Sequence, residues 1–144
     1  MSSAIPATLT FRNRGDHMRL LLRHPWFWLG LGWTFIAVAV VVSLVPGQKL
    51  PPTGVSDKLE HSVAYALLTL WFAGIYPRTA YWRIGLSMFV LGVCIEVLQG
   101  LMPFGRQPDV RDVVANSLGI VGGIALAMTG LGGWAQRIEA WARK

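Results

Sequence analysis

Most polar side chains that could take part in chemistry lie in one stretch, between Glu96 and Asn116. The stretch carries glutamate, glutamine, arginine, aspartate and asparagine between two apolar runs, Ile84–Ile95 and Val113–Leu131. If those runs cross a bilayer, the ionisable groups beside them are costly to place there and are retained mainly for function. The stretch therefore predicts a polar functional site where two membrane helices meet.

Two further patterns place polar residues on single helix faces. Asp57, His61 and Tyr65 follow one another at intervals of four residues. Glu96 and Gln99 are three residues apart. Residues at i and i+3 or i+4 are neighbours on a helix surface, so each group is expected to point in one direction.

The residues that follow the stretch change from polar to small along one face. Asp112, Asn116, Gly119 and Gly123 occupy positions i, i+4, i+7 and i+11. Small residues let membrane helices approach closely. The pattern predicts a helix that is polar at its start and packs centrally in a bundle.

A histidine, several carboxylates and an arginine support three kinds of chemistry. Acid–base chemistry could use His61 with Glu96 or Asp112. Arg106 would then hold an anionic group such as a phosphate. A divalent cation could be bound by His61, Glu96, Asp109 and Asp112, but no ligand spacing is diagnostic, so the sequence predicts neither a metal nor another cofactor. A site that only binds a lipid or peptidoglycan-precursor headgroup needs the same convergent groups.

Most of these residues also have a structural interpretation. His61 could pack between helices with a hydrogen bond to Glu96 or Asn116. Asp57 and Asp112 could each be helix caps, because a side-chain oxygen can accept hydrogen bonds from the free amides of a first turn. These interpretations stay open beside the functional ones.

Glu96 is the hardest residue to explain structurally. A lone carboxylate in an apolar run must be protonated or paired, and Arg106 in the following loop is its expected partner. Tyr65 could be an ordinary packing aromatic. Lys58 is expected to extend its ammonium group outward to solvent.

The composition indicates a membrane protein. Of 144 residues, 53% are hydrophobic and 14% are charged, whereas an ordinary soluble domain is roughly 25% charged. The seven tryptophans suit membrane interfaces. The single cysteine, Cys94, cannot form an intrachain disulfide, so folding needs no oxidising compartment.

The expected fold is all-α and polytopic, with four transmembrane helices at about residues 26–45, 57–76, 82–102 and 112–131. A helix of 20 residues at about 1.5 Å per residue spans the hydrocarbon core of about 30 Å. Residues 1–25 form a basic N-terminal segment, and residues 26–133 form the membrane domain. A signal peptide is the alternative for the N-terminus, but its apolar core would be only roughly 7–15 residues long.

The tail, residues 134–144, is amphipathic. Trp134, Ile138 and Trp141 lie on one helical face. Such a face is expected to lie on the membrane surface.

The distribution of lysine and arginine predicts the orientation. With four spans, nine of these residues share a side with both termini and four lie on the other side. Basic residues concentrate in the cytoplasm, so both termini are predicted there. The net charge of +6 is then explained by topology and anionic lipid, without nucleic acid as a partner.

Three motifs carry a family resemblance: D-K-L-E-H-S-V-A-Y from Asp57, E-V-L-Q from Glu96, and R-Q-P-D-V-R-D-V-V-A-N-S-L-G from Arg106. In this order they resemble the VanZ-like membrane protein family over about residues 57–125. The matching positions are Asp57, Lys58, His61, Tyr65, Glu96, Gln99, Arg106, Asp109, Asp112, Asn116 and Gly119.

The resemblance implies a role in the cell envelope, because the family takes its name from a protein linked to glycopeptide (teicoplanin) resistance. We predict a bacterial inner-membrane protein whose outward-facing polar pocket binds or helps handle an envelope lipid or cell-wall precursor headgroup. One alternative is a membrane enzyme with His61 as acid/base and Glu96 or Asp112 as further catalytic candidates. Another is a scaffold whose polar residues only lock helix packing. The sequence leaves the ligand, catalysis and oligomeric state open.

Overall fold

The computed structural model describes residues 22–45, 54, 56–102 and 109–143. Arg106 and most of the basic N-terminal segment therefore lie outside the described residues.

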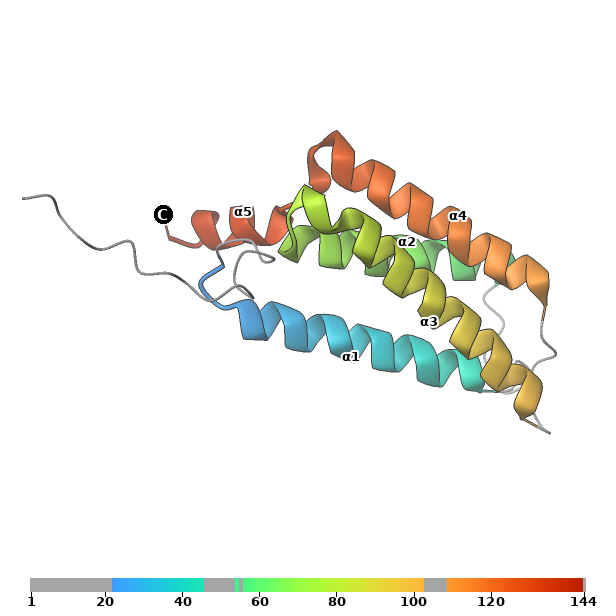
Figure 1. Ribbon diagram of the computed structural model, residues 1–144. Helices are drawn as coiled ribbons and strands as arrows, with labels where there is room; N and C mark the ends of the chain where they lie inside the picture. The colour runs from blue at the N-terminus through green and yellow to red at the C-terminus, as the bar shows by residue number, and fades with distance from the viewer. Residues whose placement is uncertain (1–21, 46–53, 55, 103–108, 144) are drawn as a thin grey trace, which may run out of the picture.

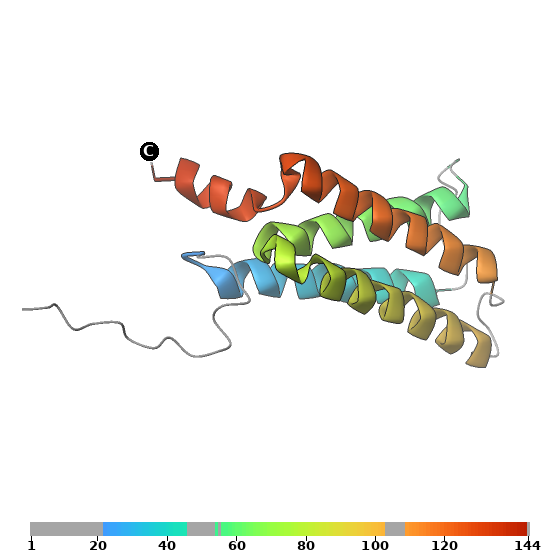
Figure 2. The ribbon, with the colours of Figure 1, turned by 45° about the horizontal axis from the view of Figure 1, so that its top comes forward.

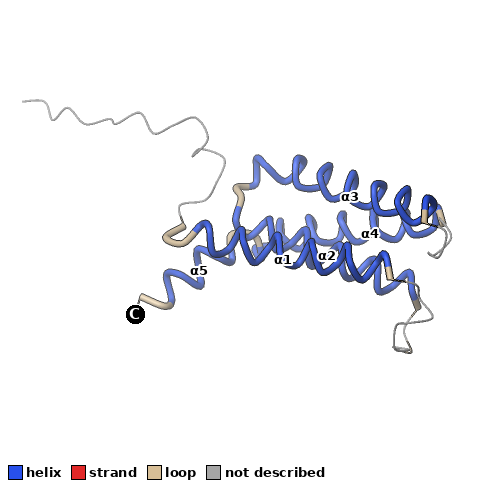
Figure 3. The backbone as a smooth tube through the Cα atoms, turned by 90° about the horizontal axis from the view of Figure 1, so that it is seen from below, coloured by secondary structure: helices blue, strands red, loops and turns tan. Residues whose placement is uncertain are grey.

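Every regular element in the described part of the chain is a helix (Figure 3). The elements are α1 (Pro25–Leu44), α2 (Asp57–Ile75), the 3₁₀ turn η3 (Arg78–Ala80), α3 (Tyr81–Leu101), α4 (Val110–Leu126), the π-helical turn η4 (Ala127–Leu131) and α5 (Trp134–Trp141). The predicted all-α class is confirmed. The four long helices begin within one or two residues of the predicted positions, and α4 passes into η4 before the predicted end.

The four long helices lie side by side, and each runs opposite to the one before it (Figures 1 and 2). The end of α1, the start of α2, the end of α3 and the start of α4 therefore meet at one end of the bundle. We call this the polar end, because the predicted site residues lie there. The short α5 lies at the opposite end, beside the start of α1 (Figure 1).

Three helical segments are long and apolar enough to cross a membrane: Pro25–Leu44, Arg78–Leu101 and Val110–Leu131. The fourth predicted span, α2, does not meet that criterion because its first turn carries Asp57, Lys58 and Glu60. Length and composition thus support a polytopic membrane protein and identify three of the four predicted spans.

The least apolar long helix is the most enclosed one. α2 contacts α1, α3, α4 and α5, and its contact with α4 is the most extensive in the molecule. The sequence predicted that the fourth helix would be central. The close packing of α4 is confirmed, but α2 contacts more of the other helices. This central position shields the polar residues of α2 from lipid.

Glycines on α4 allow the close contact with α2. A Cβ atom on Gly119 would collide with the Ser62 carbonyl oxygen, and one on Gly123 would lie 2.6 Å from that of Ala66. The small-residue face predicted for this helix is therefore the surface on which α2 packs. It holds the start of α4 against the start of α2.

A buried carboxylate joins the two ends of the described chain. Glu139 of α5 accepts hydrogen bonds from the backbone amides of Arg23 at 2.6 Å and His24 at 3.0 Å, and from the Trp28 indole at 2.9 Å. These amides precede the first turn of α1, where free donors favour an anion. This contact could not be predicted from the sequence, since Glu139 lies on a helix that was expected to lie on the membrane surface.

The tail helix is only partly as predicted. The Trp134 indole donates to the Leu70 carbonyl at 3.1 Å and packs over Gly74, so this side chain faces the bundle. Ile138 and Trp141 are exposed. These two residues remain available for the predicted contact with the membrane surface.

Glu139→Gln is expected to lower stability by about 1 kcal/mol at neutral pH, because a neutral acceptor replaces a carboxylate that takes three hydrogen bonds. Desolvation raises the pKa of Glu139, but hydrogen bonds from Arg23, Trp28 and His24 outweigh it and lower the pKa below 4.5. The stabilisation is thus present above pH 4.5 and is lost as pH falls through the lower folded value.

Thermal unfolding in detergent between about pH 3 and pH 7 measures this effect. Wild type should lose stability at the acid end more steeply than Glu139→Gln. Trp28→Phe removes one hydrogen-bond donor and keeps an aromatic ring. Its loss of stability at acid pH should be intermediate between those of wild type and Glu139→Gln. Parallel curves for all three proteins would show that Glu139 does not carry the acid-dependent stability.

Candidate functional site

The polar end brings together the starts of α2 and α4 and the end of α3. Ser56 caps α2 by accepting a hydrogen bond from the Leu59 amide at 3.3 Å. Asp109 caps α4 by accepting one from the Arg111 amide at 2.9 Å. The structural interpretation of Asp112 as the cap of the fourth helix is therefore wrong, because the helix begins at Val110 and leaves the Asp112 side chain free for tertiary contacts.

Lys58 links α2 to α4. Its ammonium group donates hydrogen bonds to Asp109 Oδ2 at 2.7 Å and to Asp112 Oδ1. The predicted outward extension of Lys58 is wrong, because these two carboxylates offer it a stronger partner than water. The Lys58 hydrogen bond lowers the pKa of Asp109, and the Arg111 amide acts in the same direction. Both groups of this ion pair are therefore charged at neutral pH.

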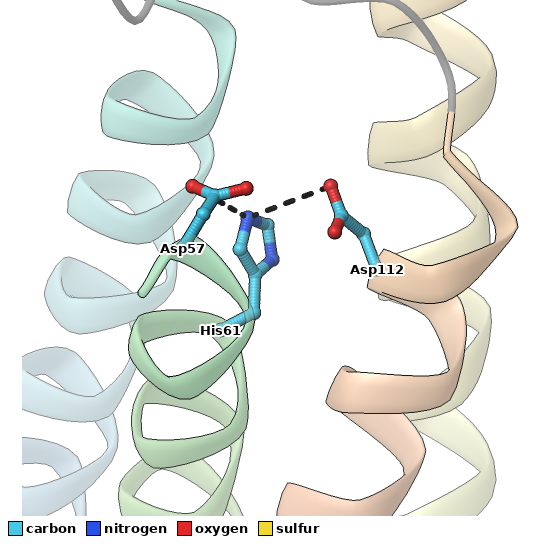
Figure 4. Close-up of side chains that lie close together, drawn as sticks. All are labelled: Asp57, His61 and Asp112. Atoms are coloured by element: carbon cyan, nitrogen blue, oxygen red, sulfur yellow. Dashed lines mark ion pairs between the residues drawn. The ribbon is translucent and has the colours of Figure 1, made fainter. Parts of the chain in front are cut away.

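His61 lies between α2 and α4, one turn below Asp57. Its Nδ1 atom is 3.1 Å from Asn116 Oδ1. Its Nε2 atom is 3.9 Å from Asp57 Oδ1 and 4.0 Å from Asp112 Oδ2 (Figure 4). The predicted structural bond from His61 to Asn116 is thus present, and two carboxylates face the opposite side of the ring.

Glu96 connects α3 to the start of α4. It is buried, with 8% of its surface exposed, and its Oε1 atom accepts a hydrogen bond from the Asp109 amide. The predicted partner, Arg106, lies outside the described residues. A carboxylate in the apolar run is thus paired with a backbone donor, which positions the N-cap residue of α4.

Gln99 turns away from the other predicted site residues. It is 2% exposed, and its side-chain amide donates to the Ser43 carbonyl at 2.7 Å. This carbonyl belongs to the last turn of α1, whose carbonyl groups have no partner within the helix. Gln99 therefore ties α1 to α3.

Tyr65 lies one turn further down α2 and is 4% exposed. Its hydroxyl has no hydrogen-bond partner among the described residues. The Tyr65 hydroxyl and the Asn116 side-chain amide both approach the Cα of Gly92 on α3, so a Cβ there would lie 3.2 Å and 3.1 Å from them. Sequence reasoning missed Gly92, although its position one turn before Glu96 could have indicated a small residue below the site.

The described site residues thus divide into two groups. Seven converge at the polar end: Asp57, Lys58, His61, Glu96, Asp109, Asp112 and Asn116. Tyr65 forms the floor beneath them, and Gln99 holds α1. The arrangement combines buried hydrogen-bond acceptors, one cation and an imidazole, which suits binding of a polar group or proton transfer to it.

The fold and the polar end define a small, multi-pass, all-α membrane protein with ionisable groups gathered at one end of its helices. Residues 33–131 match the model of the family described as VanZ/LLP1, so the chain belongs to that family and the resemblance noted from its motifs is confirmed. No curated protein and no solved structure gives a significant match to the chain.

Proposed function

We propose that this protein crosses the bacterial cytoplasmic membrane four times and uses its polar end, facing outward, to bind or help handle an envelope lipid or cell-wall precursor headgroup. The observation that carries the proposal is the meeting of Lys58, Asp112 and Glu96 from three largely apolar helices. Such groups are costly beside a bilayer and are retained mainly for function.

The path of the chain supports α2 as the fourth span. α1 ends at the polar end, and α3 begins at the opposite end (Figure 1). The 19 residues of α2 rise about 28 Å at about 1.5 Å each, close to the hydrocarbon thickness. The excess of basic residues on the side of both termini favours a cytoplasmic location for that side and an outward polar end.

An apolar cleft favours a lipid-linked ligand over a free soluble one. The cleft has a volume of about 730 Å³, lies between α1 and α2, and includes Val42, Ala64 and Leu67 in its lining. Val42 is near the end of α1, and Ala64 is less than one turn from His61. A hydrocarbon chain in the cleft would therefore bring its headgroup to the polar end.

The two alternatives each have an observation in their favour. An enzyme that uses His61 as acid/base is favoured by the position of its ring between the carboxylates of Asp57 and Asp112, where a polar group could be held beside it. A scaffold is favoured by the bond between His61 and Asn116, which joins two helices. The link to glycopeptide resistance is a further prediction from the family resemblance.

A binding titration tests the proposal. A short-chain polyprenyl diphosphate is titrated by calorimetry into the detergent-solubilised protein and into His61→Ala, Glu96→Ala and Arg106→Ala. His61→Ala and Arg106→Ala should each weaken binding about tenfold or more, as expected for a lost hydrogen bond to a charged group. Glu96→Ala should weaken binding indirectly, because it removes the acceptor of the Asp109 amide and so loosens the start of α4. Ser117→Ala is the matched control, because among the described residues its hydroxyl donates to the Val113 carbonyl of its own helix and not to a site residue.

The outcomes separate the three functions. Folded variants that bind the diphosphate as tightly as wild type would contradict a headgroup site. Failure of all three variants to accumulate, with Ser117→Ala normal, would favour the scaffold. Release of product from a labelled probe by wild type, but not by a folded His61→Gln variant, would establish an enzyme.

A further inference from the structure

The hydrogen bond to Asn116 determines which nitrogen of His61 is available. Nδ1 lies 3.1 Å from Asn116 Oδ1. A carboxamide oxygen can only accept, so Nδ1 carries the proton and donates it. In the neutral ring Nε2 then has an unprotonated lone pair. The His61 side chain is 10% exposed, so this lone pair faces protein groups more than bulk water.

Nε2 points toward a space bounded by two carboxylates (Figure 4). It is 3.9 Å from Asp57 Oδ1 and 4.0 Å from Asp112 Oδ2, too far for hydrogen bonds. One ligand atom from each residue lies within 4.8 Å of the other two. Two ligands about 2.1 Å from a tetrahedral zinc ion are about 3.4 Å apart. Small side-chain movements would therefore bring all three atoms into coordination distance.

Lys58 neutralises only part of the negative charge of this cluster. Its ammonium group binds Asp112 Oδ1 and Asp109 Oδ2 and lies 4.0 Å from Asp57 Oδ2. Three carboxylates thus share one ammonium group, which gives a net charge of −2 while His61 is neutral. Asp112 keeps its second oxygen toward His61. A divalent cation would balance this charge.

We propose that Asp57, His61 and Asp112 bind a divalent cation of the zinc type, with a coordination position left for a further ligand. Imidazole favours zinc over magnesium or calcium, which prefer oxygen ligands. Asn116 fixes the ring of His61 and Lys58 fixes Asp112, as hydrogen-bonded neighbours do for the ligands of metal sites.

This set differs from the one considered on the sequence alone. Glu96 accepts the Asp109 amide, and the Asp109 side chain accepts the Arg111 amide and Lys58. Asp57 belongs to the set because one of its carboxylate oxygens, a ring nitrogen of His61 and an oxygen of Asp112 all lie within 4.8 Å of one another. This step rests on the proposed function. The carboxylates alone would repel a phosphate, and the bound cation would provide the positive charge that holds it.

Metal titration of the intact protein tests the proposal. Chelator-treated protein in detergent is titrated with Co²⁺ and followed by absorption, and bound Zn²⁺ is counted by mass spectrometry after gel filtration. We expect one ion per chain and intense visible Co²⁺ bands that Zn²⁺ removes. Asp57→Asn, His61→Gln and Asp112→Asn should each weaken binding at least about tenfold, and Asn116→Ala about tenfold.

Glu60→Gln is the matched control, because it removes a carboxylate from the first turn of α2 outside the cluster, and it should bind Co²⁺ like wild type. Wild-type protein that binds neither ion below about 100 µM would overturn the proposal, whether or not the variants fold. An equal loss of Co²⁺ affinity in Glu60→Gln and Asp57→Asn would also overturn the proposal, since binding would then depend on general surface charge.

A second titration separates this proposal from the proposed function. The polyprenyl diphosphate is added to chelated and to Zn²⁺-loaded wild type. Tighter diphosphate binding to the Zn²⁺-loaded protein than to the chelated protein supports both the cation site and the headgroup function. Zn²⁺ binding without any diphosphate binding supports the cation site and contradicts the headgroup function. Equal diphosphate binding with and without Zn²⁺ supports the headgroup function and overturns the role of the cation in it.

Discussion

Gly119→Ala should destabilise the protein by about 3 kcal/mol, the upper end for an overpacked site. The new Cβ would collide with the Ser62 carbonyl oxygen and also meet its Cα at 3.0 Å. A side chain could rotate away, but these are backbone atoms of α2, so the two helices must separate. That separation would also part Lys58 from Asp112, so any function of the polar end should be lost with the stability.

Gly122→Ala is the matched control on the same helix. Nothing lies within 4 Å of a Cβ at Gly122, and alanine is a better helix former by about 1 kcal/mol. Thermal unfolding in detergent should show a large decrease for Gly119→Ala and no decrease for Gly122→Ala. Similar melting of the two variants would mean that α2 and α4 do not pack through Gly119.

Lys58→Met should cost about 2 kcal/mol. Removing one partner of a fully buried ion pair typically costs about 3–5 kcal/mol. The Asp112 side chain is only 6% exposed, but that of Lys58 is 40% exposed, so water can replace part of the lost interaction. Methionine keeps the apolar stem and removes the charge, so the measured change in unfolding free energy reports the ion pair.

A double-mutant cycle with Asp112→Asn isolates this interaction. The double variant Lys58→Met/Asp112→Asn should be more stable than the sum of the single effects by about 1 kcal/mol or more, because no unpaired carboxylate remains at Asp112. Lys58→Arg, which keeps the charge, should lose less than Lys58→Met. Additive single effects would contradict the direct contact between Lys58 and Asp112.

The helices and the meeting of three helix ends could be predicted from the sequence, because hydrophobic runs and i, i+4 spacing depend only on local geometry. The small face of α4 could be predicted for the same reason. Asp109 and Asp112 are both capable caps, so the start of α4 was displaced by two residues. Choosing between them requires knowing that the Asp109 side chain accepts the Arg111 amide, and that Glu96 holds the Asp109 amide in place.

The partners of several polar residues could not be predicted. Gln99 and Glu96 share a helix face in the sequence pattern, yet one bonds to α1 and the other to the Asp109 amide. Which neighbour each side chain meets depends on how far each helix is rotated and shifted against the next. Glu139 is the clearest case, because its three donors precede or begin α1, more than a hundred residues away.

The close packing of α2 on α4 has a consequence for transport. Beyond Tyr65 the two helices carry no charged side chain, from Ala66 to Ile75 and from Ser117 to Leu126. The backbones of α2 and α4 are in close contact at Gly123, so a chain of water molecules does not fit between them there. Packed backbone therefore separates the polar end from the opposite end of the bundle along this seam. For the proposed function we therefore expect an action confined to one leaflet, with the same rate in vesicles with and without a membrane potential.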